Sequence, residues 1–196
     1  MKKYFEQIFR LMLITVAGMA GSVVIGLLIY GKGVFNPATI GFAFVSFGFS
    51  GGFIFAFYHV RGVSETITTA VVLSVVQFVA ALAWFPVLNA GFWSFGVNMP
   101  VVALAFIFER KLAALKQLKF VVVGMVYAAM FVLLTLVVGV LTGVEKMPAT
   151  VFQSNFLDGL LIGVGLGLGV EGAESFIHSI EHHRTVKAQA SSKKQA

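Results

Sequence analysis

The sequence is divided into long apolar stretches without charge, each about long enough to cross a bilayer. A spanning α-helix needs roughly 20 apolar residues because the hydrocarbon core is about 30 Å thick. Charged residues lie in each of the segments between these stretches except the third, residues 89–91. That segment is either a tight hairpin or part of a re-entrant stretch. We therefore predict an all-α membrane protein, a compact bundle of about six transmembrane helices. The predicted spans are residues 11–30, 38–58, 66–88, 92–108, 120–141 and 150–170, with the last helix extending into the cytoplasm.

The composition agrees with a chain that has lipid as part of its solvent. Of its 196 residues, 59% are hydrophobic and 11% are charged, whereas roughly a quarter are charged in soluble domains. A soluble chain of this length needs a polar surface, which so few charged residues do not cover. The absence of cysteine excludes disulfides and thiolate metal sites.

Lysine and arginine gather on one side of the predicted spans. If the N-terminus is cytoplasmic, 12 of the 14 basic residues fall on the cytoplasmic side, and Lys32 and Lys146 alone fall outside. Because cytoplasmic flanks carry the excess of Lys and Arg, we predict that both termini are cytoplasmic and that the chain lies in a prokaryotic cytoplasmic membrane. The same distribution accounts for the net charge of +6 without a nucleic-acid partner.

The apolar runs end near residue 170, and polar residues follow them. We assign residues 1–183 to the transmembrane domain. Residues 184–196 are basic and rich in Ser, Ala and Gln, and we predict a disordered cytoplasmic tail because such a segment has little apolar surface to bury. The first run is long enough to span and has no convincing cleavage site, so we expect a retained helix and not a cleaved signal peptide.

Small residues at four-residue spacing mark faces on which membrane helices approach closely. In the sixth span, however, Gly163, Gly165, Gly167 and Gly169 alternate with apolar residues, so that they point to every side of a helix. Each costs about 1 kcal/mol relative to alanine, and the segment is therefore either surrounded by neighbours or unwound around a cavity. The predicted packing positions are Gly18, Ser22, Gly26, Gly48, Gly52, Gly159, Gly163 and Gly167.

Several polar side chains fall in the outer half of the predicted spans, where each needs a partner. Asp158 lies about 12 Å along the last span at 1.5 Å per residue, and no Lys or Arg lies at its depth. We predict a carboxyl that exchanges a proton or coordinates a cationic solute; hydrogen bonding between helices is the plainer alternative. The candidate binding residues are Asp158, Asn155, Gln77, Asn98 and Thr135.

A second polar cluster begins where the sixth span leaves the membrane. Carboxylate and imidazole ligands on one helix face could hold a divalent transition metal, but a solvated, charge-compensated helix end explains the same residues. We predict no metal site and no cofactor. The cluster consists of Glu171, Glu174, His178, Glu181 and His182.

No catalytic motif such as a phosphate-binding loop or a zinc-protease helix is present in the sequence, which favours transport over catalysis. We expect a multi-pass membrane protein that binds or transports a small solute or ion through its outer half. One alternative is a non-catalytic membrane subunit or scaffold that packs on a protein partner, or on a second copy, through its glycine-rich helices. The other is a membrane enzyme or metal site at the cytoplasmic end of the sixth helix.

Overall fold

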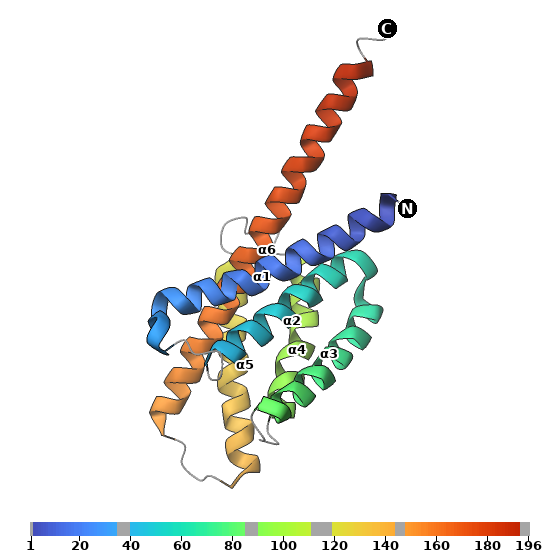
Figure 1. Cartoon of the computed structure of the whole chain (residues 1–196). Helices are drawn as coiled ribbons and strands as arrows, with labels where there is room; N and C mark the ends of the chain where they lie inside the picture. The colour runs from blue at the N-terminus through green and yellow to red at the C-terminus, as the bar shows by residue number, and fades with distance from the viewer. Residues whose placement is uncertain (1, 35–39, 85–89, 111–118, 144–147, 193–196) are drawn as a thin grey trace.

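A computed structural model shows an all-helical chain (Figure 1), with no strand among the residues that it describes. These are residues 2–34, 40–84, 90–110, 119–143 and 148–192. The all-α prediction is confirmed for them. The helices are α1 Lys2–Val34, α2 Ile40–Arg61, α3 Val63–Trp84, α4 Ala90–Arg110, α5 Lys119–Leu141 and α6 Ala149–Ser192.

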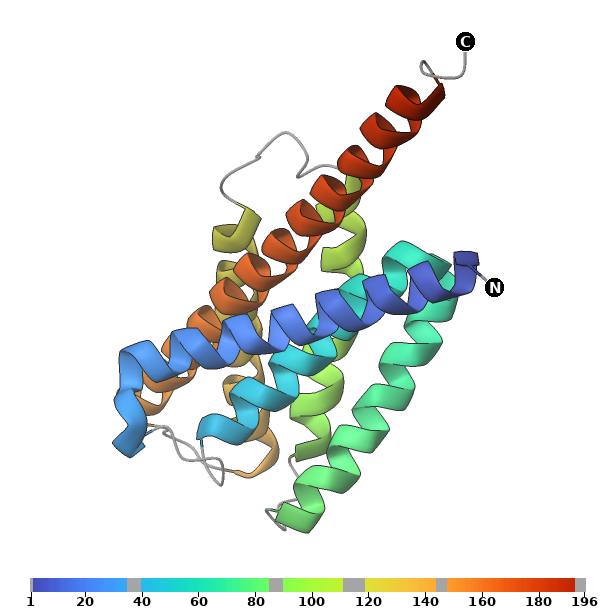
Figure 2. The same cartoon turned by 45° about the horizontal axis from the view of Figure 1, so that its top comes forward.

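The helices α1, α2, α3, α5 and α6 are long and apolar enough to cross a membrane. In α4 the apolar part within the described side chains is shorter, Trp93–Ile107. The chain is therefore a multi-pass membrane protein. The count of six spans and the cytoplasmic location of the termini remain predictions, although the start of α1 and the end of α6 lie toward the same end of the bundle (Figures 1 and 2).

The terminal helices extend well beyond the apolar runs that predicted them. Helix α6 has 44 residues and is about 66 Å long at 1.5 Å per residue, so it projects beyond the rest of the bundle (Figure 1). It includes residues 184–192 of the segment that the sequence analysis assigned to a disordered tail. Ala, Gln, Lys and Arg are strong helix formers, which is why the helix continues after the apolar residues stop.

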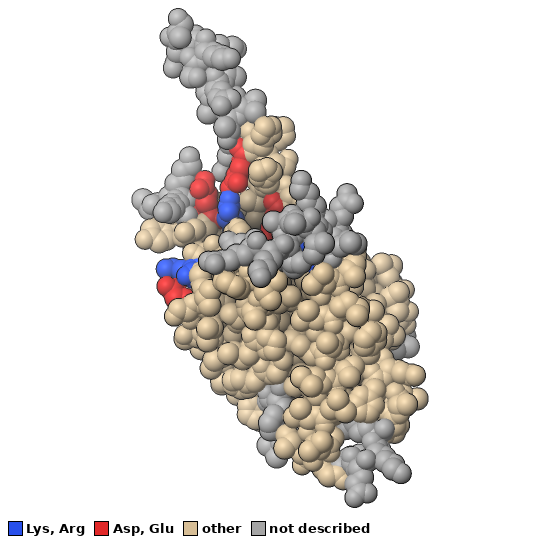
Figure 3. Space-filling model, turned by 180° about the vertical axis from the view of Figure 1, so that it is seen from behind, with Lys and Arg blue, Asp and Glu red and all other residues tan. Residues whose placement is uncertain are grey.

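Helices α1, α2, α5 and α6 form the closely packed part of the bundle. Helix α6 packs against both α5 and α1, and α2 packs along α1. Helices α3 and α4 pack against one another and contact the rest mainly through α2. Figure 3 shows charged side chains of one face gathered toward the end that carries the termini, above an uncharged surface.

Gly62 and Gly31 have positive φ angles and interrupt helical geometry. Gly62 (φ 84°) separates α2 from α3, and its amide donates to the Tyr58 carbonyl at 2.9 Å, as in the left-handed residue that commonly ends a helix. Gly31 (φ 71°, ψ 167°) interrupts the helical geometry of α1 directly after Tyr30. The long straight part of α1 therefore ends at Tyr30.

Candidate functional site

The alternating glycines of α6 form two interleaved packing faces. A Cβ added at Gly159 or Gly163 would lie 2.7 Å or 2.6 Å from backbone oxygens of α5, and one at Gly167 would lie 2.7 Å from the Phe120 Cα. A Cβ at Gly165 would instead lie 2.5 Å from the Gly21 oxygen of α1, and Gly169 also faces α1. The segment is thus a continuous helix surrounded by neighbours, and of the two arrangements expected for it the unwound one does not occur.

The predicted small residues of α1 and α2 face one another. A Cβ at Gly18 would lie 3.1 Å from the Gly52 Cα, and one at Gly48 would lie 2.8 Å from Ser22 Oγ. Ser22 is buried and donates to the Ile162 carbonyl of α6 at 2.9 Å. Gly26 is also buried. Helix α1 is therefore held between α2 and α6 by backbone approach, with Ser22 bridging to α6.

Asp158 is hydrogen-bonded to Tyr30 at the end of α1. The Tyr30 hydroxyl donates to Asp158 Oδ1 at 2.6 Å, and both side chains are half-buried. Tyr30 is the hydrogen-bond partner of this carboxyl within the described part of the chain, and the ion pairs Arg10–Glu181 and Arg61–Glu65 lie elsewhere. The carboxyl is therefore held by a neutral donor on one oxygen, with no described cationic side chain paired to it.

Asn155 lies one turn before Asp158 and makes a contact with a different helix. Its Nδ2 donates to Thr135 Oγ1 at 2.7 Å, and the Thr135 hydroxyl donates to the Phe131 carbonyl of its own helix at 2.7 Å. Asn155 thus connects α6 to α5, while Asp158 connects α6 to α1. The two polar residues of α6 lie close in sequence and have separate partners.

Gln77 and Asn98 belong to a hydrogen-bonded group that joins α2, α3 and α4. Asn98 Nδ2 donates to Gln77 Oε1 at 2.6 Å and to Ser74 Oγ at 3.1 Å, and Asn98 Oδ1 accepts from Ser50 Oγ at 2.8 Å. Gln77 Nε2 donates to Ser46 Oγ at 2.9 Å. Asn98 is fully buried, and its amide atoms are all bonded here, so this group connects three helices and has no polar atom on Asn98 left for a ligand.

The five predicted binding residues therefore lie in three separate hydrogen-bonded groups. One holds Gln77 and Asn98, the second holds Thr135 and Asn155, and the third holds Asp158. Tyr30 was not predicted as a site residue. The sequence feature that could have identified Tyr30 is its place at the end of the first apolar run, directly before Gly31 and Lys32. That placement is also typical of aromatic residues at the membrane interface, so it does not by itself indicate a site.

Tyr127 of α5 is a second tyrosine that the sequence analysis did not select. Its side chain is fully buried, and its hydroxyl has no hydrogen-bond partner among the described residues. The hydroxyl occupies the space that a side chain at Gly51 would need. This glycine is thus required for α2 to pack beside Tyr127, and the ring is fixed between α2, α5 and α6.

The polar cluster of α6 that begins at Glu171 is not gathered into a metal site in the described residues, where no group of three His, Cys, Asp or Glu side chains could hold a metal ion. Glu181 instead pairs with Arg10 of α1. The other members of the cluster project along the same helix, as expected for residues at helical spacing.

Comparison with protein-family models, with curated proteins and with solved structures found no match to this chain.

Proposed function

We propose that this multi-pass membrane protein binds and transports a proton or a small cation, and that Asp158 is the binding group in the outer half of the bundle. The observation that carries the proposal is the hydrogen bond between Tyr30 and Asp158. A carboxylate within a membrane span costs about 3 kcal/mol on insertion scales. A residue with that cost is expected to have a function, a charged partner or both.

The chemistry of the pair favours a cationic ligand. A phenol donates one hydrogen bond and carries no charge at neutral pH, so Tyr30 orients the carboxyl without neutralising it. Asp158 Oδ2 has no hydrogen-bond donor among the described residues. A proton or a small cation on this oxygen would remove the negative charge, and Tyr30 would keep the carboxyl in place before and after binding.

The contacts between α1 and α6 could couple ion binding at Asp158 to a movement of α1. Two polar contacts connect the helices near opposite ends of α1: the hydrogen bond Tyr30–Asp158 and the ion pair Arg10–Glu181. The close contact of Gly21 with Gly165 lies between them. We propose that a change in the Tyr30–Asp158 hydrogen bond alters the tilt of α1 about this glycine contact. The alternative function, a scaffold that packs on a partner through glycine-rich helix faces, would need glycines that are open to a partner. Five glycines of α6 are instead covered by α1 or α5 of the same chain: Gly159, Gly163, Gly165, Gly167 and Gly169.

The proposal is tested by ion flux into proteoliposomes that contain the purified chain and trapped indicators of pH, Na⁺ and K⁺. A pH gradient and gradients of Na⁺ and K⁺ are imposed in turn. We expect flux above that of empty liposomes for the wild type, background flux for Asp158→Asn, and reduced flux for Tyr30→Phe. Asp158→Asn keeps the size and a hydrogen-bond acceptor but removes the charge.

Asn155→Ala is the matched control, because it removes a polar contact of the same helix one turn away. We expect its flux to remain close to that of the wild type. Flux through Asp158→Asn equal to that of the wild type would overturn the assignment of Asp158 as the binding group.

A further inference from the structure

The small-residue faces of α1 and α2 both end in an aromatic residue. Residues four apart lie on one face of a helix. The series at this spacing on α1 consists of Gly18, Ser22, Gly26 and Tyr30. The series that faces it on α2 consists of Phe44, Gly48 and Gly52. The two aromatic residues therefore belong to the same helix interface as the glycine contacts described above.

Phe44 packs edge-on against Tyr30. The two ring centroids are 6.3 Å apart, and the ring planes meet at 87°, which is a preferred arrangement for aromatic pairs. Phe44 is fully buried, and Tyr30 is half-buried. The Tyr30 ring thus lies against α2, while its hydroxyl donates to Asp158 Oδ1 of α6 at 2.6 Å.

The helix that carries Tyr30 gives its ring little support. A helical side chain leans toward the N-terminus, over the turn before its own Cα, and the residue one turn before Tyr30 is Gly26, which has no side chain. Residues 27–29 are all more than a third exposed, and helical geometry breaks at Gly31. The orientation of the Tyr30 ring therefore depends on the neighbouring helices.

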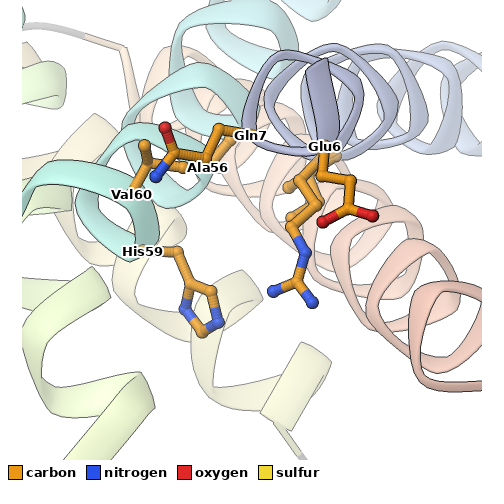
Figure 4. A pocket seen from close by; sticks show the side chains of 7 residues that line it. Glu6, Gln7, Ala56, His59 and Val60 are labelled. Atoms are coloured by element: carbon orange, nitrogen blue, oxygen red, sulfur yellow. The ribbon is translucent and has the colours of Figure 1, made fainter. Parts of the chain in front are cut away.

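The interface between α1 and α2 is less tightly closed at its other end. A hollow of about 220 Å³ lies there between the first half of α1 and the end of α2, and the His59 ring is directed across it toward α1 (Figure 4). Its lining consists of Glu6, Gln7, Arg10, Ile14, Ala56, His59 and Val60. Side chains thus fill the interface at the end that carries Asp158 and leave space at the opposite end.

We propose that Phe44 is a positioning residue for Asp158: its ring holds the Tyr30 ring in the orientation that keeps the phenol hydroxyl on Oδ1. Phe44 has no donor or acceptor of its own and therefore acts through Tyr30. It connects α2 to a hydrogen bond that is formed by α1 and α6. Its effect on ion binding rests on the proposed function of Asp158, whereas its effect on the Tyr30–Asp158 hydrogen bond does not.

The size of the effect follows from the strength of an aromatic pair. Such a pair changes an equilibrium by about two- to twelve-fold beyond the area that it buries. Removal of the Phe44 ring should therefore lower the population of the Tyr30–Asp158 hydrogen bond by up to this factor, relative to states in which the Tyr30 ring has turned away.

The first test measures the contact between Tyr30 and Asp158 directly. Asp158 is the one aspartate of the sequence, so the full chain is made with ¹³C at the aspartate carboxyl and at the tyrosine ring carbon that bears the hydroxyl. Solid-state NMR in lipid bilayers then records the correlation signal between these carbons, which is assigned to Tyr30 by its loss in Tyr30→Phe. We expect Phe44→Leu to weaken this signal about two-fold or more.

Phe47→Leu is the matched control. Phe47 lies one turn further along α2, is also buried, and packs edge-on against Phe131 of α5 with ring centroids 5.5 Å apart. Because both variants remove the same group from the same helix, a general loosening of α2 would weaken the signal in both. We expect Phe47→Leu to keep the wild-type signal. Phe44→Met, whose unbranched side chain adapts to the space that is left, replaces Phe44→Leu if that variant does not fold.

The second test measures the effect on the carboxyl. The Asp158 ¹³C resonance is followed against pH and against Na⁺ or K⁺ in the wild type, in Phe44→Leu, in Tyr30→Phe and in the double variant. We expect Phe44→Leu to move the midpoint of the response in the same direction as Tyr30→Phe does. In the double variant it should add nothing, because Phe44 acts through the hydroxyl that Tyr30→Phe removes.

Three results would overturn the positioning role: no correlation signal in the wild type, an unchanged signal in Phe44→Leu, or an equal loss in Phe47→Leu. Additive effects in the double variant would also overturn it, because Phe44 would then act on the carboxyl without Tyr30. A wild-type carboxyl resonance that responds to neither pH nor cations would instead contradict the proposed ion binding. Positioning by Phe44 would stand in that case if the correlation signal still depended on its ring.

Discussion

The packing of α6 on α1 predicts opposite effects for two substitutions only three residues apart. A Cβ at Gly169 would lie 2.6 Å from the Ala17 carbonyl carbon and 2.9 Å from the Gly18 Cα, whereas a Cβ at Gly172 would have no neighbour within 4 Å. Because carbon atoms in contact are about 3.5–4.0 Å apart, Gly169→Ala requires α1 to move by about 1 Å. Gly172→Ala requires no movement.

The expected magnitudes follow from two opposing terms. Alanine is favoured over glycine in a helix by about 1 kcal/mol, and overpacking costs about 1–3 kcal/mol. Gly169→Ala should therefore lower the free energy of unfolding by up to about 2 kcal/mol, and Gly172→Ala should raise it by up to about 1 kcal/mol. Unfolding in mixed micelles with increasing denaturing detergent measures both. Equal stability of the two variants would refute the assignment of Gly165 and Gly169 to the α1 interface.

Other predictions concern the polar groups and the topology. Asn98→Leu removes the partner that Gln77 and Ser50 share and should lower the unfolding free energy by about 1–3 kcal/mol, measured in the same micelles. Thr135→Val removes the bond from Asn155 and the bond to the Phe131 carbonyl of its own helix and should cost less, about 1 kcal/mol. An equal loss in the two variants would contradict the larger role of the Asn98 group. Because the chain lacks cysteine, single cysteines placed at 32, 146 and 187 report topology with an impermeant thiol reagent: the first two should be labelled from outside in intact cells and the third only after lysis. External labelling at 187 would contradict the cytoplasmic C-terminus.

The approximate positions of the helices could be predicted from the sequence, because a helix that crosses the hydrocarbon core needs a long run of uncharged residues and such runs can be found by inspection. The same criterion does not locate a helix end that lies outside the apolar run. Helix α1 begins near Lys2 and α6 continues to Ser192, where the chain is polar and apolar runs carry no information. In those turns the helix propensity of Lys, Glu and Ala decides the structure.

The pairing of polar residues could not be predicted from the sequence, because it depends on which face of each helix meets which neighbour. Asp158 and Tyr30 are separated by 128 positions in the chain, and their contact requires the straight part of α1 to end beside the first turns of α6. The sequence analysis grouped Asn98 with Asp158 as candidate binding residues only because their predicted depths in the membrane are similar. In the structure they belong to different hydrogen-bonded groups. The glycine alternation did show that α6 has close neighbours on several sides, without showing which helix faces each glycine.

The central claim is that Asp158 is a carboxyl that exchanges a proton or binds a cation. Asp158 is the one aspartate of the sequence, so ¹³C-labelled aspartate introduced by cell-free synthesis labels this side chain alone. The carboxyl ¹³C resonance of the chain in lipid bilayers is then measured by solid-state NMR against pH and against added Na⁺ or K⁺. We predict that the resonance shifts with pH or with one of the cations, and that the size or midpoint of the shift changes in Tyr30→Phe. A resonance that stays constant under every one of these conditions would contradict the claim.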